Sequence, residues 1–231
     1  LRMTATSPNN QVKNFTLNRT GSGAEISIGT NGLEVNNLLT VTNGILRANG
    51  NVVLISDING TARVGQLIAP ADITGNVIVQ RYVQSIVRRS RMISPSTVGF
   101  NFSQLKDDIF VTGPGGVING FDASPSNGQT AYTYQESTTN TRGWKGLTNI
   151  NNTLTPGKGA LVFVRGDRTL PSPQWYTPPY VQQNNVTIDF VGDLNKGDIS
   201  PAITYTNTGV SGDDGWNLVG NPYAAPIDWN S

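Results

Sequence analysis

Two residue types that carry much of enzyme chemistry are absent from this chain: its 231 residues include no histidine and no cysteine. Without them a Ser-His-Asp or Cys-His nucleophile cannot be assembled, and neither can a zinc or copper site built from His and Cys. No disulfide braces the fold, but a chain of this length buries about 70% of its unfolded surface and needs none. We therefore expect a non-enzymatic protein without a cofactor.

Charge is also scarce, since charged residues make up 13% of the chain and the formal net charge is +1. Such a chain has no field to steer nucleic acid or a membrane surface toward it. It contains no apolar run long enough to span a bilayer, and we expect no signal peptide within it. Gly, Asn, Thr and Ser are abundant instead. This composition is typical of extracellular β proteins, so we expect an extracellular or cell-surface location.

Residues 1–74 are predicted to form a repetitive β segment, in which short apolar runs alternate with Asn-Gly pairs. Asn-Gly is the strongest short-range turn signal because both residues tolerate positive φ. The pairs are Asn31-Gly32, Asn43-Gly44, Asn49-Gly50 and Asn59-Gly60. Two architectures fit, namely solenoid-like rungs of a parallel β-solenoid or a meander of hairpins. The shortness of each run favours the solenoid.

Residues 75–231 are predicted to form an antiparallel β-sandwich, jelly-roll-like in outline and truncated at its C-terminal end, so the whole chain is expected to be all-β. Apolar runs predict strands at 76–83, 131–134, 160–164 and 186–191. No window of helical period is long enough for a helix of several turns, and only one turn is expected near 103–107.

The stretch 215–229 is expected to organise this second part. Trp216 and Leu218 alternate with Asn217, which predicts a half-buried strand with Trp216 in the core. At Gly220-Asn221-Pro222 the strand should stop in a turn, where the Asn side chain bonds the backbone of the turn. We expect this corner to pin two sheets together.

An earlier segment, residues 92–102, echoes this pattern. A short apolar strand ends in Pro95, and Phe100 and Phe102 follow it at the offsets at which Ile227 and Trp229 follow Pro222. The common spacing predicts two similar structural elements.

Several short segments in a fixed order carry a likeness to a known family. Among them is the pattern Gly-Trp-Asn-Leu-Val-Gly-Asn-Pro-Tyr followed by Ile-Asp-Trp, and the set comprises residues 39–44, 54–57, 60–62, 75–82, 120–122, 156–159, 162–168 and 215–229. The chain resembles modules of large surface and adhesin-like proteins of Bacteroidota that the type IX secretion system exports. Ser90 departs from the pattern, which has an aromatic there. The resemblance implies an extracellular structural or adhesive module, with no catalytic residues to carry over.

Two loops invite a binding hypothesis. Asp193, Asn195 and Asp198 resemble the start of a calcium loop, but the twelfth position holds Thr204 in place of the bidentate Glu, so a polar hairpin turn competes with a calcium site. Residues 165–167 spell the Arg-Gly-Asp tripeptide that integrins bind, and we interpret them as a turn with an Arg–Asp pair.

Charged clusters give weaker signals. Asp107-Asp108 and Asp213-Asp214 are paired carboxylates and Glu136 is the best lone acid, but glycoside hydrolysis needs two carboxylates that face each other. The one basic cluster comprises Arg81, Arg88, Arg89 and Arg91. We interpret it as a solvated strand pair with stacked guanidinium groups, and expect no nucleic-acid partner.

Aromatic residues supply the remaining candidates. Trp175 and Tyr176 lie between prolines that keep their loop stiff, so their rings are suited to stacking on sugars, and Trp144 is a third candidate. The competing interpretation is that Trp175 covers the end of the sandwich.

From these patterns we predict a non-enzymatic extracellular structural or adhesive module of a larger surface-exposed or filamentous protein. Its expected partners are other β domains of the parent protein or neighbouring copies, reached through unpaired sheet edges at both ends. The alternative is a carbohydrate-binding module that uses the exposed aromatics to hold a polysaccharide.

Overall fold

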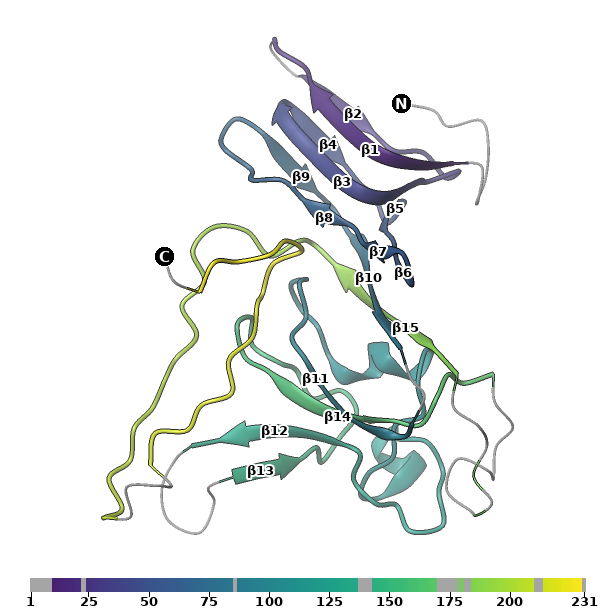
Figure 1. Ribbon diagram of the computed structural model, residues 1–231, viewed down its shortest axis with the longest axis vertical. Coiled ribbons are helices and arrows are strands. Elements are labelled where there is room, and N and C mark those ends of the chain that lie inside the picture. Colours follow the sequence, from purple (N-terminus) through teal and green to yellow (C-terminus); the bar gives the residue numbers. More distant parts are fainter. Residues whose placement is uncertain are drawn as a thin grey trace.

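The computed structural model describes residues 10–21, 24–84, 87–136, 143–169, 178, 180, 184–209 and 214–229. Within these ranges the chain forms strands and two short 3-10 helices, η1 (Phe102–Lys106) and η2 (Gly116–Asn119), and no α-helix (Figure 1). The all-β prediction is confirmed, as is the helical turn expected near 103–107, but η2 was not expected.

Strands of the N-terminal part alternate between two sheets. In chain order they are β1 (Gln11–Asn18), β2 (Glu25–Ser27), β3 (Leu33–Asn43), β4 (Ile45–Arg47), β5 (Val52–Leu54) and β9 (Asp72–Thr74). In one sheet β1 pairs with β3 and β3 with β5, and in the other β2 pairs with β4 and β4 with β9. All of these pairs are parallel. A hairpin meander would pair consecutive strands antiparallel, so the described strands do not form one.

The turns explain the parallel pairing. Gly44 has a φ of +86°, and a Cβ there would lie 2.6 Å from the carbonyl oxygen of Ala24. Asn49 and Gly50 have φ values of +53° and +75°. Each turn sends the chain into the other sheet, and the next turn sends it back beside the earlier strand.

The third pass of the chain is irregular. After β5 comes an antiparallel hairpin of β6 (Ser56–Asp57) and β7 (Gly60–Thr61), and β8 (Arg63–Val64) then pairs in parallel with β3. Because this hairpin interrupts the pass, no regular solenoid is seen in the described residues.

The second part contains antiparallel strands. They are β10 (Val77–Val83), β11 (Arg89–Ile93), β12 (Ala131–Gln135), β13 (Gly143–Gly146), β14 (Ala160–Val164) and β15 (Val186–Gly192). Four of them form a sheet in the order β11-β14-β12-β13. Strand β10 pairs in parallel with β5 and antiparallel with β15, so one sheet runs from the first part into the second. The domain boundary predicted between residues 74 and 75 falls just before β10 and stays a prediction.

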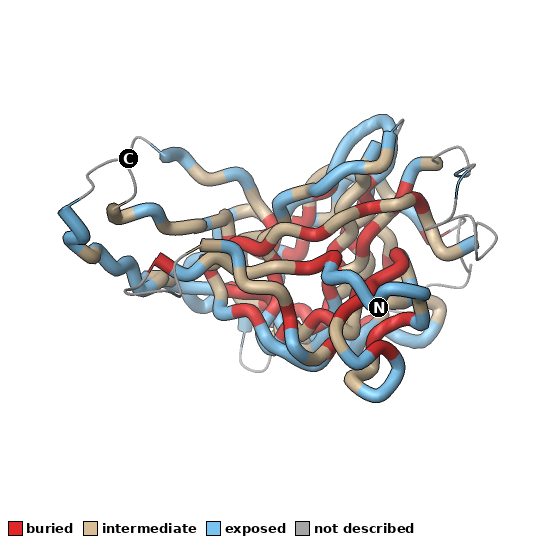
Figure 2. Tube along the Cα trace, turned by 90° about the horizontal axis from the view of Figure 1, so that it is seen from below, coloured by how far each residue is buried: buried red, intermediate tan, exposed pale blue. Residues whose placement is uncertain are grey.

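The buried side chains of both parts form one hydrophobic cluster. It includes Leu33, Leu39 and Leu54 from the parallel strands and Phe100, Phe102 and Phe190 from the second part. The ring centroids of Phe100 and Phe190 lie 5.5 Å apart, edge to face. Buried residues run through the middle of the molecule in Figure 2, while residues 199–209 and 214–219 extend away from it and are exposed or half-buried.

The prediction for the stretch 215–229 was wrong in its main point. Trp216 is 63% exposed and Trp229 is 68% exposed, and Leu218 is only half-buried. Asn217 instead joins this segment to residue 204, because its side-chain amide donates to the carbonyl of Thr204 and its Oδ1 accepts from the Thr204 N–H. The two segments form an arm; the N–H of Gly159 donates to Leu218, but none of the described arm residues is buried, so alternation produces no buried side. The echo segment differs, since Phe100 and Phe102 are fully buried.

The turn expected in the corner at residues 220–224 is confirmed, although residues 215–219 form no strand before it. Oδ1 of Asn221 accepts from the Tyr223 N–H at 2.9 Å, and its Nδ2 donates to the carbonyl of residue 225. The corner connects distant parts of the chain: the N–H of Val64 donates to Ala224, and the side chain of Asn195 donates to Pro222. It therefore pins the N-terminal strands to the second part.

Candidate functional site

Among the predicted glycan-binding residues, the structure describes only Trp144. It lies on β13, at one end of the four-stranded sheet, and is 44% exposed. Its ring packs edge to face against Tyr134, with the centroids 5.4 Å apart. Trp175 and Tyr176 lie outside the described residues, so the sugar-stacking loop stays a prediction.

The three calcium candidates Asp193, Asn195 and Asp198 differ in burial and in what they bind. Asp193 and Asp198 are exposed, whereas Asn195 is buried and donates through Nδ2 to the carbonyls of Pro95 and Pro222. Asn195 thus serves as a crosslink inside the protein. No group of three or more His, Cys, Asp or Glu that could hold a metal occurs within the described ranges. The calcium hypothesis stays a prediction.

The Arg-Gly-Asp tripeptide is built into the fold, and the predicted Arg–Asp pair does not form. The guanidinium of Arg165 stacks over Phe163 at 5.0 Å and over Phe110 at 5.8 Å from the ring centroids. Burial, helped by the nearby charge of Arg88, lowers the pKa of Arg165 to about 10. Asp167 accepts hydrogen bonds from Thr169 and Asn184 instead.

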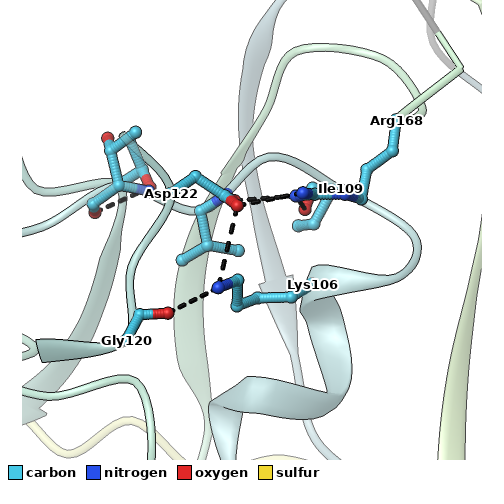
Figure 3. Close-up of polar contacts among 8 residues, drawn as sticks. Lys106, Ile109, Gly120, Asp122 and Arg168 are labelled. Atoms are coloured by element: carbon cyan, nitrogen blue, oxygen red, sulfur yellow. Dashed lines mark hydrogen bonds and ion pairs between the residues drawn. The ribbon is translucent and has the colours of Figure 1, made fainter. Parts of the chain in front are cut away.

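A buried ion pair that the sequence did not reveal lies nearby (Figure 3). Asp122 is buried, and Arg168 donates to both of its oxygens at 2.8 and 3.0 Å. The N–H of Val111 donates to the same carboxylate at 2.7 Å, and Lys106 lies 3.8 Å from it while donating to the carbonyl of Gly120. Asp122 and Arg168 lie 46 positions apart, and no pattern in the sequence indicates that they pair.

Asp108 of the first predicted carboxylate pair lies beside Asp189 and not opposite a second catalytic acid of its own pair. Oδ2 of Asp108 accepts from the N–H of Asp189 at 2.8 Å, and burial, with the nearby charges of Asp189 and Asp107, raises the pKa of Asp108 to about 7. Burial and the charge of Asp107 also raise the pKa of Asp189. Asp213 lies outside the described residues.

Glu136, the lone acid, holds the two segments of the arm together. Burial opposes its ionisation, but hydrogen bonds from the side chains of Thr204 and Thr206 and the N–H groups of Thr206 and Gly215 prevail, so the pKa of Glu136 is lowered. A carboxylate stabilised in this way suits a structural role better than that of a general acid.

Three arginines of the basic cluster line a groove between β10 and β11 with a volume of about 620 Å³. We call it the arginine groove. Arg81 of β10 and Arg89 and Arg91 of β11 line it, together with Tyr82 and, from the corner, Tyr223. Arg88 is turned elsewhere, since its guanidinium stacks over Tyr180 at 3.8 Å and over Phe163 at 5.6 Å. The predicted strand pair does not form, since β10 and β11 belong to different sheets; Arg88 stacks on aromatic rings, while the other three arginines line the groove.

The groove carries positive charge without a matching negative charge. None of the described residues that line it is acidic. Arg81 donates to the carbonyl of Gln80 and Arg91 to that of Gln84, and these are neutral acceptors. Burial lowers the pKa of Arg81, and burial together with the charge of Arg89 lowers the pKa of Arg91. The site therefore favours an anion.

No family model, curated protein or solved structure matches the chain. Within the described residues, no helix is long and apolar enough to cross a membrane.

Proposed function

We propose that this chain is a non-enzymatic structural or adhesive module of a larger extracellular protein, and that it associates with other β structure through strand edges. The observation that carries the proposal is the position of β1 and β2, each of which ends the order of strands in its sheet. An end strand presents a row of backbone donors and acceptors that another strand can use.

The character of β1 supports this assignment. Only Leu17 of its eight residues is buried, although the strand is paired along its length with β3. Val12 and Phe15 pack against the core only in part. A further strand laid beside β1 would cover these side chains and continue the parallel pairing, so we propose that the N-terminal strands are the end of a solenoid-like stack.

Composition and the family resemblance support an extracellular location. The chain lacks His and Cys and has little charge, and its segments resemble those of type IX-secreted surface proteins. We infer an extracellular location on these grounds. We also propose a sandwich for the second part, with Phe100, Phe102 and Phe190 between the β10–β15 pair and the four-stranded sheet.

The alternative, a carbohydrate-binding module, rests on a specific observation. Trp144 is partly exposed on an end strand, and its ring packs edge to face against Tyr134. Exposed rings fixed in this way stack on sugar faces.

Strand-edge association is tested by sedimentation of the purified chain over a wide concentration range. We expect reversible self-association that weakens in the variant Thr16→Pro, because proline on the exposed β1 strand removes a donor and blocks a neighbouring strand. The matched control Thr16→Ala keeps the N–H and should associate like the unmodified chain. Monomeric behaviour at all concentrations, or equal association of the two variants, would rule the edge out.

A further inference from the structure

We propose that the arginine groove binds an acidic polysaccharide, with Arg81, Arg89 and Arg91 receiving the anionic groups of its sugars. Ligand binding in this groove and strand-edge association are separate properties, so either can fail without the other.

The charge of the groove is the first reason. Three arginines line one cavity, and no acidic residue does so among the described residues. Arg89 is exposed and makes no ion pair within the described part of the chain. Guanidinium groups bind carboxylate and sulfate through paired N–H donors, and such charge-assisted hydrogen bonds are about twice as strong as neutral ones. An anion would relieve the repulsion between Arg89 and Arg91.

The walls of the groove indicate a sugar rather than a small inorganic anion. Tyr82 and Tyr223 are half-buried and line the cavity, as do the apolar side chains of Met92 and Ile93. Amphipathic rings beside charge donors match a sugar, which has an apolar face and a polar rim. The volume of about 620 Å³ lies within the usual range for small-ligand sites, so the groove has room for a short run of sugars.

Part of the groove wall is held by hydrogen bonds before any ligand arrives. The hydroxyl of Tyr223 donates to the carbonyl of Gly197 at 2.6 Å, and Asn221 is locked in its own turn. Arg91 is held by the carbonyl of Gln84 at 3.1 Å. A preformed site loses less entropy on binding, so local contacts suffice for affinity.

Local charge does not make this chain a nucleic-acid binder. The net charge of +1 provides no long-range attraction, and a duplex would need an extended basic surface. A short acidic glycan needs only the local set of three arginines.

Isothermal titration of the full chain at low salt tests the proposal with four probes. Oligogalacturonate supplies sugar carboxylates, dextran sulfate supplies sugar sulfates, dextran is the neutral sugar, and polyglutamate supplies carboxylates without sugar. We expect saturable binding to one or both acidic glycans, weakened by salt, and none to dextran. Which of the two binds identifies the anionic group.

Variants locate the binding. Arg89→Gln combined with Arg91→Gln should weaken affinity at least tenfold, while the matched control Arg19→Gln, an exposed arginine of the N-terminal part, should leave it unchanged. Thermal unfolding of each variant verifies that it is folded. If the double variant does not fold, Arg89→Gln alone is tested, because the Arg89 side chain is exposed and its replacement should not disturb the fold. Absence of binding to both acidic glycans, equal binding to polyglutamate, or unchanged affinity in the groove variants overturns the proposal.

Discussion

At the scale of the residue, the aromatic side chains differ in what packs against them. Phe100 is fully buried between Phe102 and Phe190, whereas Trp216 projects from an arm. We expect Phe100→Ala to cost about 3–5 kcal/mol of unfolding free energy, the usual cost of deleting a buried aromatic. Trp216→Ala should cost less than about 1 kcal/mol. Urea denaturation of both variants measures the difference, and similar losses would mean that Trp216 packs against more than the structure indicates.

The Asp122–Arg168 pair is a second residue-scale feature with a measurable consequence. Removing one partner strands a charge in a buried site, so Asp122→Asn or Arg168→Met should each cost about 2–4 kcal/mol. The double variant should cost less than the sum of the two, by about 1 kcal/mol or more, because the partners interact directly. Denaturant unfolding of the four proteins of this cycle gives the coupling. Glu25→Gln, which breaks the exposed pair with Arg47, is the control and should cause no comparable loss.

Local turn chemistry could be predicted from the sequence because it depends on adjacent residues. Asn221 before a proline forms its own hydrogen bonds whatever surrounds it. Burial of Trp216 could not be predicted, because alternation gives a strand two sides but does not tell whether another layer covers either of them. The pairing of Asp122 with Arg168 also depends on residues 46 apart, beyond the reach of spacing rules.

At the scale of the element, Asp108 and Asp189 place two carboxyl groups where η1 meets β15. Because the pKa of Asp108 in the folded protein is about 7, above its ordinary value of 3.8, the folded state holds this proton more tightly than the unfolded state. The stability it contributes is fully present below pH 3.8 and is lost as the pH rises through 7. The total loss of unfolding free energy should reach about 1–2 kcal/mol. This is less than the full pKa shift at about 1.36 kcal/mol per unit would give, because the carboxyl is only partly buried.

Denaturation between pH 5 and 8 measures most of this loss, in a range where the chain has no histidine to titrate. Asp108→Asn should flatten the profile. Carboxyl NMR titration of Asp108 supplies an independent reading, and an ordinary pKa there would contradict the expectation.

The element order could be predicted only in part. Asn-Gly turns identified where the chain reverses, because positive φ is a property of those residues. Whether the next strand pairs with its neighbour or with the strand one pass earlier depends on which side chains the two layers bury, and apolar runs such as Val52–Leu54 fit either arrangement. The arginine groove escaped prediction for a related reason: Arg81 and Arg89 lie on strands of different sheets that the fold brings together.

At the scale of the whole molecule, β10 belongs to both halves and one hydrophobic cluster runs through them. We therefore expect a single cooperative unfolding transition, in which calorimetric and van't Hoff enthalpies agree. Leu54→Ala in the first part and Ile188→Ala in the second should lower the same midpoint. Two separate transitions, each moved by only one of these substitutions, would show that the parts unfold independently.

Some contacts of the N-terminal strands, such as the bond from Val64 to the corner at residues 220–224, can form only late in synthesis. During synthesis the N-terminal strands emerge first, but Val64 bonds to Ala224, and Val77 of β10 pairs with Gly192. More than a hundred residues must therefore be made before these closures are available, and such distant pairings make folding slow. Until then β10 presents an open edge on the side that β15 later covers. A nascent chain of this protein is thus exposed to wrong partners along β10 until β15 has been made.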